Sequence, residues 1–293
     1  MPATSAPTPG TAALVPPTAV IEIAARLEGA GFETWCVGGA VRDALLGVAH
    51  LDWDLATAAT PAEVRRRFAR TVPAGIDHGT IGVIGSAGRM HEVTTFRADV
   101  ETDGRHATVR FGVSLDEDLA RRDFTINAMA WSPSRGVLHD PFGGRDDLAR
   151  GVVRAVGEPA TRMAEDRLRA LRALRFASRF GFDIEPRTWG AIVDSAPHLT
   201  RLSVERVKQE WEKTLRQVAR PSLAFERWRA SGALRTLLPA LHAAPAWAFA
   251  ACDHAPRPDD ARHPARADLR YLVRLALPLL ALAPGEARRL LKG

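Results

Sequence analysis

Two aspartates separated by one residue are the first feature of this sequence that could do chemistry. In Leu51-Asp52-Trp53-Asp54-Leu55, apolar and acidic residues alternate as they do in a β-strand. Alternate strand residues share a face, so the two carboxylates point the same way, about 6 to 7 Å apart. Their repulsion requires compensation, and a divalent cation such as Mg²⁺ prefers hard oxygen ligands of this kind. A solvated strand face with two acids is the alternative interpretation.

A third carboxylate lies in another strand-like segment. Glu92 belongs to His91-Glu92-Val93-Thr94-Thr95-Phe96, and if this segment pairs beside Leu51–Ala56, its carboxylate can join the two aspartates. A site of this kind can hold two metal ions roughly 4 Å apart, one to activate an attacking hydroxyl and one to carry a triphosphate. The third acid therefore favours metal-assisted phosphoryl transfer over a solvated face.

A glycine pair shortly before the aspartates could bind phosphate. In Gly38-Gly39-Ala40-Val41-Arg42-Asp43, the glycines lie between a predicted strand and a predicted helix. Such a junction exposes backbone N–H groups and lets an anion approach closely, and an arginine adds two parallel donors. A glycine pair alone is equally typical of a tight turn. The order of glycine pair, arginine and Asp-x-Asp is the specific signal, and the sequence contains no Gly-x-x-x-x-Gly-Lys-[Ser/Thr] phosphate loop.

The elements that must position these residues form an α/β first part of the chain. The pattern predicts helices over Ala19–Ala30, over Val41–Leu46, from Thr60-Pro61 onward and in parts of Leu115–Ala130. Strands are predicted over Thr34–Val37, Leu51–Ala56, Ile81–Ile84, His91–Phe96, Val137–Leu138 and Val152–Val156, and a loop over Val100–His106.

The second part of the chain reads as all-helical. Helices are predicted over 161–180, 186–197, 203–218, 221–231 and 268–282, with Ala243–Ala265 as a long loop. The predicted fold class is therefore α+β, a small α/β head with a mixed sheet followed by an all-helical neck and body.

The charge of the chain changes sign along its length. Residues 1–159 hold 16 arginines and 20 acids, whereas residues 160–293 hold 24 arginines or lysines and 14 acids, for a net charge of +6. Acidic sites bind metal ions and basic surfaces bind phosphate polymers, so the two parts have different tasks. A GC-rich genome, which inflates arginine and alanine, is the alternative explanation of the basic excess.

Composition also excludes several classes of protein. No apolar run has the length of a membrane span, and the first residues lack the pattern of a secretory signal. The two cysteines, Cys36 and Cys252, are too few for a disulfide scaffold or a four-cysteine zinc site. We therefore expect a cytoplasmic protein without membrane contact.

Taken together, the motifs resemble a known family. Gly-Gly-x-x-Arg-Asp followed by Asp-x-Asp resembles the first motif of the DNA polymerase β-type nucleotidyltransferase superfamily. The segments Arg121-Arg122-Asp123-Phe124-Thr125-Ile126-Asn127-Ala128 and Glu165-Asp166-x-x-Arg169 resemble class II CCA-adding tRNA nucleotidyltransferases and their bacterial poly(A) polymerase relatives. The resemblance spans residues 33–215, and His78-Gly79-Thr80 is more similar to the CCA-adding branch.

The resemblance implies a role for each matching residue. Asp52 and Asp54 would bind Mg²⁺, and Glu92 would complete the catalytic carboxylates. The residues that would contact the triphosphate, ribose or base are Gly38, Gly39, Arg42, Arg122, Asp123, Asn127, Asp166, Arg169, Arg172 and Arg175. Of these, Gly39 and Arg42 would hold the triphosphate, and the last four would line a pocket for base and phosphate.

The predicted helix over 161–180 contains a regular row of charged residues. Asp166, Arg169, Arg172 and Arg175 recur every third residue, which makes one polar stripe on a helix. A solvent-exposed stripe with a salt bridge is the alternative. An aspartate acceptor beside an arginine donor matches the amino group and ring nitrogen of cytosine and adenine, whereas uracil and guanine present the reverse order. Mismatched buried polar groups are costly, so one such pair can select C and A without a template.

The resemblance also implies a domain organisation. We expect a disordered lead-in over 1–18, a catalytic head over 19–157, a neck for base recognition over 158–218, and a body over 219–293 with a short or absent tail. The expected activity is template-independent addition of CCA to the 3′ end of tRNA from CTP and ATP, with release of pyrophosphate. The sequence leaves the oligomeric state open.

Three alternatives to full CCA addition stay open. A poly(A) polymerase shares the catalytic motifs, and a partial enzyme would add only CC or only A. From another class, a non-catalytic RNA-binding protein could keep a relic head. Asp103-Gly104-Arg105-His106 stands where the family has a flexible loop linked to A addition, which favours full CCA addition.

Overall fold

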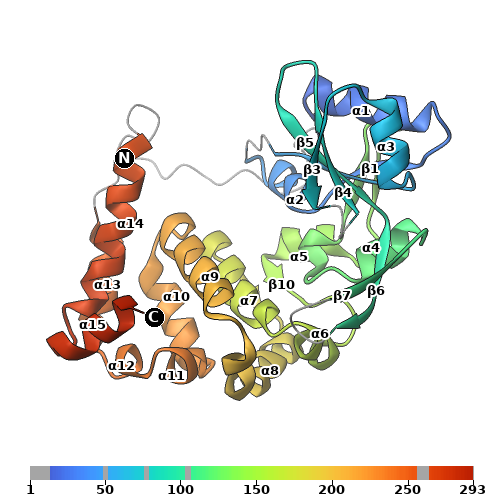
Figure 1. The fold of residues 1–293 in the computed structure, drawn as a ribbon. Coiled ribbons are helices and arrows are strands. Elements are labelled where there is room, and N and C mark those ends of the chain that lie inside the picture. The colour runs from blue at the N-terminus through green and yellow to red at the C-terminus, as the bar shows by residue number, and fades with distance from the viewer. Residues whose placement is uncertain (1–13, 49–51, 76–78, 103–106, 256–263, 293) are drawn as a thin grey trace, which may run out of the picture. The chain divides into compact units, whose positions relative to one another are not determined.

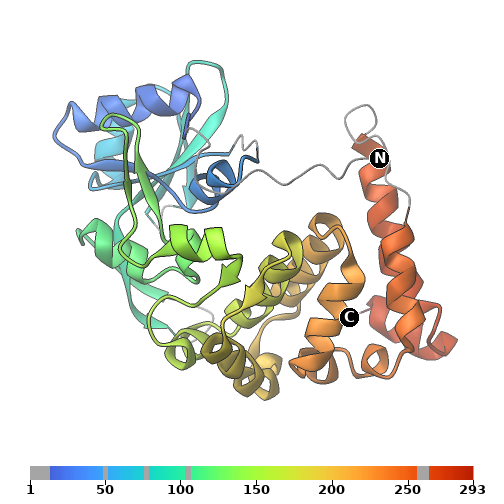
Figure 2. The same cartoon turned by 180° about the vertical axis from the view of Figure 1, so that it is seen from behind.

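The chain folds into two compact units. The computed structural model describes residues 14–48, 52–75, 79–102, 107–255 and 264–292. One unit, the head unit, comprises Met1–Gly157, and the other, the helical unit, comprises Glu158–Gly293. Figures 1 and 2 show a sheet with helices packed on it in the head unit and a succession of helices in the helical unit. The predicted α+β class, with an α/β head and a helical remainder, is confirmed.

The head unit combines strands with short helices. In chain order its elements are α1 (Thr18–Glu28), β1 (Thr34–Val37), α2 (Gly39–Leu45), β2 (Asp54–Thr57), α3 (Pro61–Arg67), β3 (Thr71–Gly75), β4 (Thr80–Ile84), β5 (Met90–Thr95), β6 (Arg97–Thr102), β7 (Ala107–Phe111), α4 (Leu115–Ala120), the 3-10 turn η2 (Thr125–Asn127), β8 (Ala130–Ser132), β9 (Val137–His139), α5 (Gly144–Arg150) and β10 (Val152–Val153).

The main sheet is mixed, as predicted. Its seven strands lie in the order β3-β4-β5-β2-β1-β8-β9, and β2 and β5 are parallel neighbours, whereas β1 is antiparallel to both β2 and β8. The register places Val37 beside Asp54 and Leu55 beside Val93. The end of β1 and the starts of β2 and β5 therefore meet at one end of the sheet, where the glycine pair and the acids lie.

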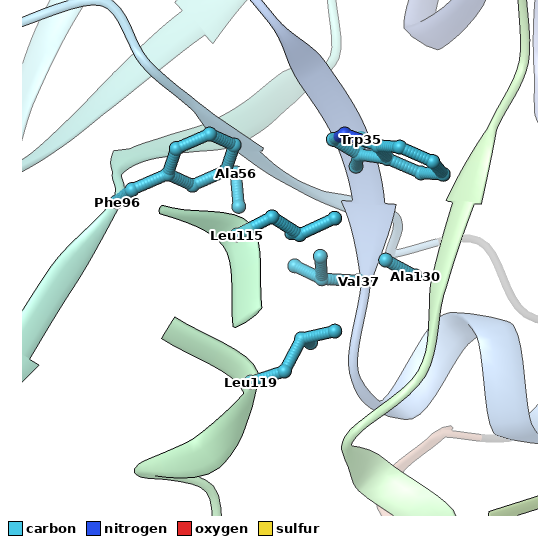
Figure 3. Packing of buried hydrophobic residues seen from close by; sticks show 7 residues of the cluster. All are labelled: Trp35, Val37, Ala56, Phe96, Leu115, Leu119 and Ala130. Carbon is cyan, nitrogen blue, oxygen red and sulfur yellow. The ribbon is translucent and has the colours of Figure 1, made fainter. Parts of the chain in front are cut away.

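A hydrophobic cluster fixes the sheet against α4. Figure 3 shows its members converging from β1, β2, β8, α4 and the residue between β5 and β6: Trp35, Val37, Ala56, Phe96, Leu115, Leu119 and Ala130. All seven are at most 6 % exposed. Because strand side chains alternate between faces, Cys36 and Leu55 point to the opposite face, and both are fully buried. The strands that lead into the candidate site are thus held from both sides.

Local signals explain several element boundaries. At the start of α3, the Thr60 hydroxyl accepts from the backbone N–H of Glu63 at 3.3 Å, and the Glu63 carboxylate accepts from the backbone N–H of Thr60 at 2.8 Å. This reciprocal pair is a capping box, with Pro61 at the first helical position, and it confirms the predicted start. Ser114 and Glu117 form the same arrangement at α4.

The predicted loop over Val100–His106 is wrong in its described part. Residues 97–102 form β6, which pairs antiparallel with β7 as a two-stranded sheet. Within Arg97–Thr102, the only large apolar residue is Val100, so no alternation marks the strand. The short strands β3 and β8 were also not predicted, since pairing with neighbours rather than local pattern makes them strands.

The helical unit contains helices from start to end, apart from the two-residue strand β11 (Asp183–Ile184). They are α6 (Pro159–Glu165), α7 (Leu168–Phe180), α8 (Pro186–Ser195), η3 (Ala196–Arg201), α9 (Val204–Gln217), α10 (Pro221–Ala230), α11 (Ala233–Leu237), α12 (Pro239–His242), α13 (Ala246–Ala250), η4 (Ala251–His254), α14 (Pro264–Leu279) and α15 (Pro284–Lys292). Among the described residues, no helix has the length and apolar character that crossing a membrane requires.

Two predictions for the helical unit need correction. The predicted long loop over Ala243–Ala265 contains α13 and η4. The predicted helix over 161–180 is two helices, because Asp166 adopts an extended conformation (φ −146°, ψ 103°). Its side chain accepts from the backbone N–H of Leu168 at 3.0 Å, an interaction that competes with a continuous helix.

Candidate active site

The two aspartates of the Asp-x-Asp motif lie at the start of β2. Asp52 and Asp54 are exposed, whereas Trp53 between them is 3 % exposed and faces the core. The predicted alternation is therefore present, although the strand itself begins only at Asp54 and Leu51 lies outside the described residues. Both carboxylates reach solvent at the same end of the sheet.

Glu92 reaches this region from the neighbouring strand. Because Leu55 pairs with Val93 in parallel β2 and β5, Glu92 stands beside Asp54 and, like it, is exposed. The pairing that the sequence left conditional is thus present. The residue before Glu92, His91, is buried and hydrogen-bonded to the backbone of Trp53. Burial and the nearby Arg89 lower the pKa of His91, so a neutral imidazole joins the two acid-bearing segments.

The carboxylates of Asp52, Asp54 and Glu92 lie close enough to repel one another. Partial desolvation of the Asp54 carboxyl, followed by repulsion from Glu92 and Asp52, raises its pKa to about 6. Arg122 opposes the shift. A negatively charged end of the sheet with exposed carboxylate oxygens is a donor set that suits a hard divalent cation.

The three acids are neighbours without forming a complete ligand cage. Within the described residues, no group of three or more His, Cys, Asp or Glu side chains is gathered closely enough to hold a metal ion. Mg²⁺ in nucleotide enzymes is commonly bound by one or two carboxylates together with substrate phosphates and water. Asp52 and Asp54 fit that pattern better than a cage made by the protein alone.

The glycine pair forms the turn between β1 and α2. Gly38 has φ 74° and ψ −134°, a conformation that side chains other than glycine rarely adopt. A Cβ placed on Gly38 would stand 2.8 Å from Nη1 of Arg122, and one placed on Gly39 would stand 3.3 Å from Nη2 of Arg42. The turn is therefore flanked by two guanidinium groups, next to Asp54 across the β1–β2 register.

Arg42 lies in a buried network rather than on the surface. It is 3 % exposed, and its Nε donates to Asp43 at 2.7 Å while Nη1 donates to the Asn127 side-chain oxygen. The Asn127 amide in turn donates to Asp123 at 2.9 Å. Arg42, Asp123 and Asn127 are thus brought together in one network. Their arrangement favours Arg42 as the support of the turn over a freely exposed phosphate ligand.

Arg122 is a predicted cation of the head unit whose charge acts on Asp54. It is half-buried, its Nη2 donates to Asp118 at 3.3 Å, and its Nη1 donates to the Asn127 backbone carbonyl at 3.4 Å. Its Nε is buried and has no hydrogen-bond partner among the described residues. With Nη1 against Gly38 and its charge felt by Asp54, Arg122 is placed to contact an anion at the turn.

In the helical unit, Asp166 lies in the break between α6 and α7. One carboxylate oxygen caps α7 through Leu168, and the other accepts from Nη2 of Arg206 at 2.8 Å. Arg169, 8 % exposed, donates to Glu165 at 2.6 Å and to the backbone carbonyl of Arg162 at 3.1 Å. Asp166 and Arg169 therefore lie at the beginning of α7, each held by a partner of opposite charge.

The other two arginines of the predicted stripe differ from each other. Arg172 is half-buried, with its guanidinium 5.3 Å from the Phe176 ring centre. Arg175 is 4 % exposed and donates through Nε to Glu210 of α9 at 2.7 Å. The sequence placed Arg175 in the pocket lining, whereas the structure places it between two helices, because a carboxylate buried in α9 requires a cation.

In each unit, partners of the predicted residues were not singled out from the sequence as site residues. In the head unit, Asp43 pairs with Arg42 and Asp118 pairs with Arg122. In the helical unit, Glu210 pairs with Arg175 and Arg206 pairs with Asp166. Of these, Asp43 had a local signal as the last residue of the Gly-Gly-x-x-Arg-Asp motif, and Arg206 lies within the span of the resemblance, residues 33–215. His78, and the segment Asp103–His106 that the resemblance links to A addition, lie outside the described residues.

Comparisons with known proteins place these sites in a family. Residues 34–154 match the family described as "Poly A polymerase head domain", and residues 181–244 match "Probable RNA and SrmB- binding site of polymerase A". The CCA-adding enzyme of Leuconostoc mesenteroides is 50 % identical over 195 residues, 66 % of this chain and 48 % of that protein. The CCA-adding enzyme of Geobacillus stearothermophilus is 46 % identical over 192 residues, 65 % of this chain and 47 % of that protein.

Solved structures give the same result. The Bacillus stearothermophilus CCA-adding enzyme in complex with CTP matches with a TM-score of 0.68 and 42 % identity, over 73 % of this chain and 52 % of that one. The Thermotoga maritima CCA-adding enzyme complexed with tRNA matches with a TM-score of 0.69 and 26 % identity, over 92 % of this chain and 64 % of that one. The chain thus spans about half the length of the curated relatives that it matches.

The two matched segments follow one another in this chain in the order head, then RNA-binding region, and the first contains the glycine turn, the acids and Arg122. The chain therefore belongs to the nucleotidyltransferase family of CCA-adding enzymes and poly(A) polymerases.

Proposed function

We propose that this protein adds C and A nucleotides, as CCA, to the 3′ end of tRNA from CTP and ATP without a template. The observation that carries the proposal is the meeting of the Gly38 turn, Arg122 and Asp54 at one end of the sheet. Phosphate-binding groups beside repelling carboxylates are what transfer of a nucleotidyl group requires. The curated relatives named CCA-adding enzyme support CCA as the product.

The head unit would carry out the chemistry. The tRNA 3′-hydroxyl attacks the α-phosphate of CTP or ATP, and pyrophosphate leaves. Gly38, Gly39 and Arg122 would hold the triphosphate. Arg42, whose guanidinium lies against Gly39, would support the turn. Asp123 and Asn127, joined by a hydrogen bond, would border the ribose. Each of these groups binds or orients the nucleotide, so that the α-phosphate faces the acids.

Nucleotidyltransferases of this family generally use a divalent metal ion. We propose Mg²⁺, held by Asp52 and Asp54 and assisted by Glu92. When bound, it would lower the pKa of the attacking hydroxyl and neutralise charge that develops on the leaving pyrophosphate. The raised pKa of Asp54 supports this assignment, because a cation at this point would relieve the repulsion among the carboxylates.

The helical unit would select the base and bind the RNA. The Asp166 carboxylate and the Arg169 guanidinium offer an acceptor and a donor near the start of α7, the order that cytosine and adenine require. Arg172 would add a contact to the nucleotide, and Arg175 would hold α7 in position through Glu210. We propose residues 158–218 as the neck that does this and 219–293 as a body that contacts tRNA, with 19–157 as the catalytic head after a lead-in over 1–18.

Both cysteines are buried and free, which is compatible with the reducing cytoplasm, where we propose that the protein acts. The test distinguishes this function from three alternatives. A poly(A) polymerase would make poly(A), a partial enzyme would add only CC or only A, and an RNA-binding protein with a relic head would add nothing.

The test is nucleotide incorporation resolved at single-nucleotide length. The purified chain is given tRNA that ends at the discriminator base, Mg²⁺, and CTP and ATP singly or together. We expect three added nucleotides that require both. A stop after two with CTP, or extension only of tRNA ending in CC, would assign part of the work to another enzyme. A long ladder with ATP alone would assign poly(A) synthesis, and tight tRNA binding without extension would assign the relic head.

Two substitutions and a chelator test the assignment of Mg²⁺ to Asp52 and Asp54. Asp52→Ala and Asp54→Ala should each abolish extension while circular dichroism stays unchanged, and excess EDTA should abolish it in the unaltered protein. Retained extension in both variants would overturn the assignment.

A further inference from the structure

Asp118 is a buried carboxylate that the proposed chemistry does not use. It lies in α4 and is 1 % exposed. Its Oδ1 accepts from Nε and Nη2 of Arg121 at 3.0 and 2.9 Å, and its Oδ2 accepts from Nη2 of Arg122 at 3.3 Å. Burial by itself would raise the pKa of Asp118, but the two guanidinium groups lower it, so the carboxylate is ionised.

The single negative charge is shared unequally between the two arginines. Arg121 makes two short bonds to one oxygen, whereas Arg122 makes one longer bond to the other. Arg121 therefore provides most of the neutralisation, and Arg122 retains positive charge for another anion. The Nη1 atom of Arg122 lies 2.8 Å from where a Gly38 Cβ would stand. Asp118 thus directs the charged end of Arg122 to the glycine turn.

Few other groups fix the orientation of Arg122. Its Nη1 makes a long bond, 3.4 Å, to the backbone carbonyl of Asn127, and its Nε has no partner among the described residues. A long side chain held by few bonds loses its orientation when its charged partner is removed. Asp118 itself is well fixed, since it also accepts from the backbone N–H of Arg97 at 3.3 Å. That bond ties it to the first residue of β6.

We infer that Asp118 is a positioning residue for nucleotide binding, which holds the Arg122 guanidinium against the Gly38-Gly39 turn so that the triphosphate meets an oriented cation. The inference rests on the proposed function only in the identity of the ligand, a nucleoside triphosphate. Asp118 does not touch the ligand. It acts through Arg122, and its effect exists only while Arg122 is present.

The experiment is a double-mutant cycle on binding of CTP with Mg²⁺ in the absence of tRNA, measured by isothermal titration calorimetry on the full chain. Asn in Asp118→Asn keeps an acceptor for the Arg97 N–H and removes the charge that orients Arg122. We expect the affinity for CTP to fall by about tenfold or more, since small misplacements of a binding group have effects of this size. In an Arg122→Gln background the same change should alter affinity less than about twofold.

A matched control lies on the same helix. Glu117 is the preceding residue of α4 and pairs with Arg110 at 3.0 Å, but both side chains are exposed and Glu117 has no bond to Arg122. Glu117→Gln should leave CTP affinity unchanged even where it lowers the melting temperature through the α4 cap. If Asp118→Asn does not fold, Asp118→Glu, which keeps the charge and moves it by one methylene, takes its place with the same expected loss.

The outcomes separate positioning from mere structural support. Wild-type affinity in Asp118→Asn overturns the inference, and so does an equal loss with and without Arg122. A protein that binds CTP but extends no tRNA would overturn the proposed function, while the cycle would still decide the role of Asp118.

Discussion

The guanidinium of Arg122 lies against the backbone of Gly38, so close that a Cβ on Gly38 would stand 2.8 Å from Nη1. The contact joins the turn after β1 to the segment after α4, two parts of the chain that are distant in sequence. The turn requires glycine at this position because Gly38 has φ 74°. The site requires it as well, because a side chain would meet the Arg122 guanidinium.

We therefore predict that Gly38→Ala removes nucleotide addition. The methyl group would displace Arg122, and the backbone strain should lower the free energy of unfolding by about 1–3 kcal/mol. Incorporation assays and urea denaturation measure the two effects. Gly136→Ala is the matched control, since Gly136 has φ 64° and a methyl group added there would meet no neighbour within 4 Å. It should lose stability and keep activity. Full activity in Gly38→Ala would contradict the packing argument.

Asp54→Asn should stop addition and yet stabilise the metal-free protein. The folded-state pKa of Asp54 is raised to about 6, so the folded chain binds more protons than the unfolded chain between pH 4 and 6. The stability of the unaltered protein in EDTA should thus fall as the pH rises through this range. Because the side chain is exposed and partly screened, we expect Asn to recover no more than about 1 kcal/mol at pH 7.

Urea denaturation at pH 4.5 and pH 7 checks this sign. The difference between Asp54→Asn and the unaltered chain should be small at the lower pH and largest at the higher one. A variant that is less stable than the unaltered chain at pH 7 would contradict the repulsion among Asp54, Glu92 and Asp52.

Asp166→Asn should weaken discrimination between bases. An amide can still cap α7 at Leu168, so the helix should form, but its NH₂ group can donate to the uracil carbonyl that a carboxylate repels. We expect the preference for CTP over UTP to fall by about tenfold or more, measured as the ratio of kcat/KM values. Asp183→Asn, an exposed acid of β11 in the same unit, should keep the original ratio. An unchanged ratio in Asp166→Asn would remove Asp166 from base recognition.

Breaking the Arg175–Glu210 ion pair should first of all lower the stability of the fold. Both side chains are at most 4 % exposed, so Glu210→Leu leaves a buried guanidinium with its main anionic partner removed. We expect a loss of about 3–5 kcal/mol in the free energy of unfolding, and recovery of most of it when Arg175→Met is added. Glu226→Leu, on the exposed side of α10, should change stability by less than about 0.5 kcal/mol. A loss below about 1 kcal/mol in Glu210→Leu would show that the pair is not needed for packing.

Elements with local signals could be predicted from the sequence. Thr60, Pro61 and Glu63 mark the start of α3 by themselves, and the alternation around Trp53 gives the correct faces for Asp52 and Asp54. The hairpin of β6 and β7 could not be predicted in this way, since its polar residues form strands only by pairing with each other. Asp166 likewise breaks the expected helix through a bond to a neighbouring backbone N–H, which apolar spacing does not register.

The sequence alone identifies which kinds of residue the site contains: the acids, the glycine turn and the arginines of two ordered motifs. The spacing of these motifs is recognisable because the chemistry constrains it. The tertiary structure decided which of these charges remain available. Arg42, Arg122 and Arg175 look alike in the sequence. Arg42 and Arg175 are at most 4 % exposed and make bonds of 2.7 Å to Asp43 and Glu210, whereas Arg122 is half-buried and shares Asp118 with Arg121. Glu210 is 35 residues away from Arg175. The reason is physical: a charge is neutralised or offered to a ligand according to what folding buries beside it, and long-range neighbours leave no trace in local spacing.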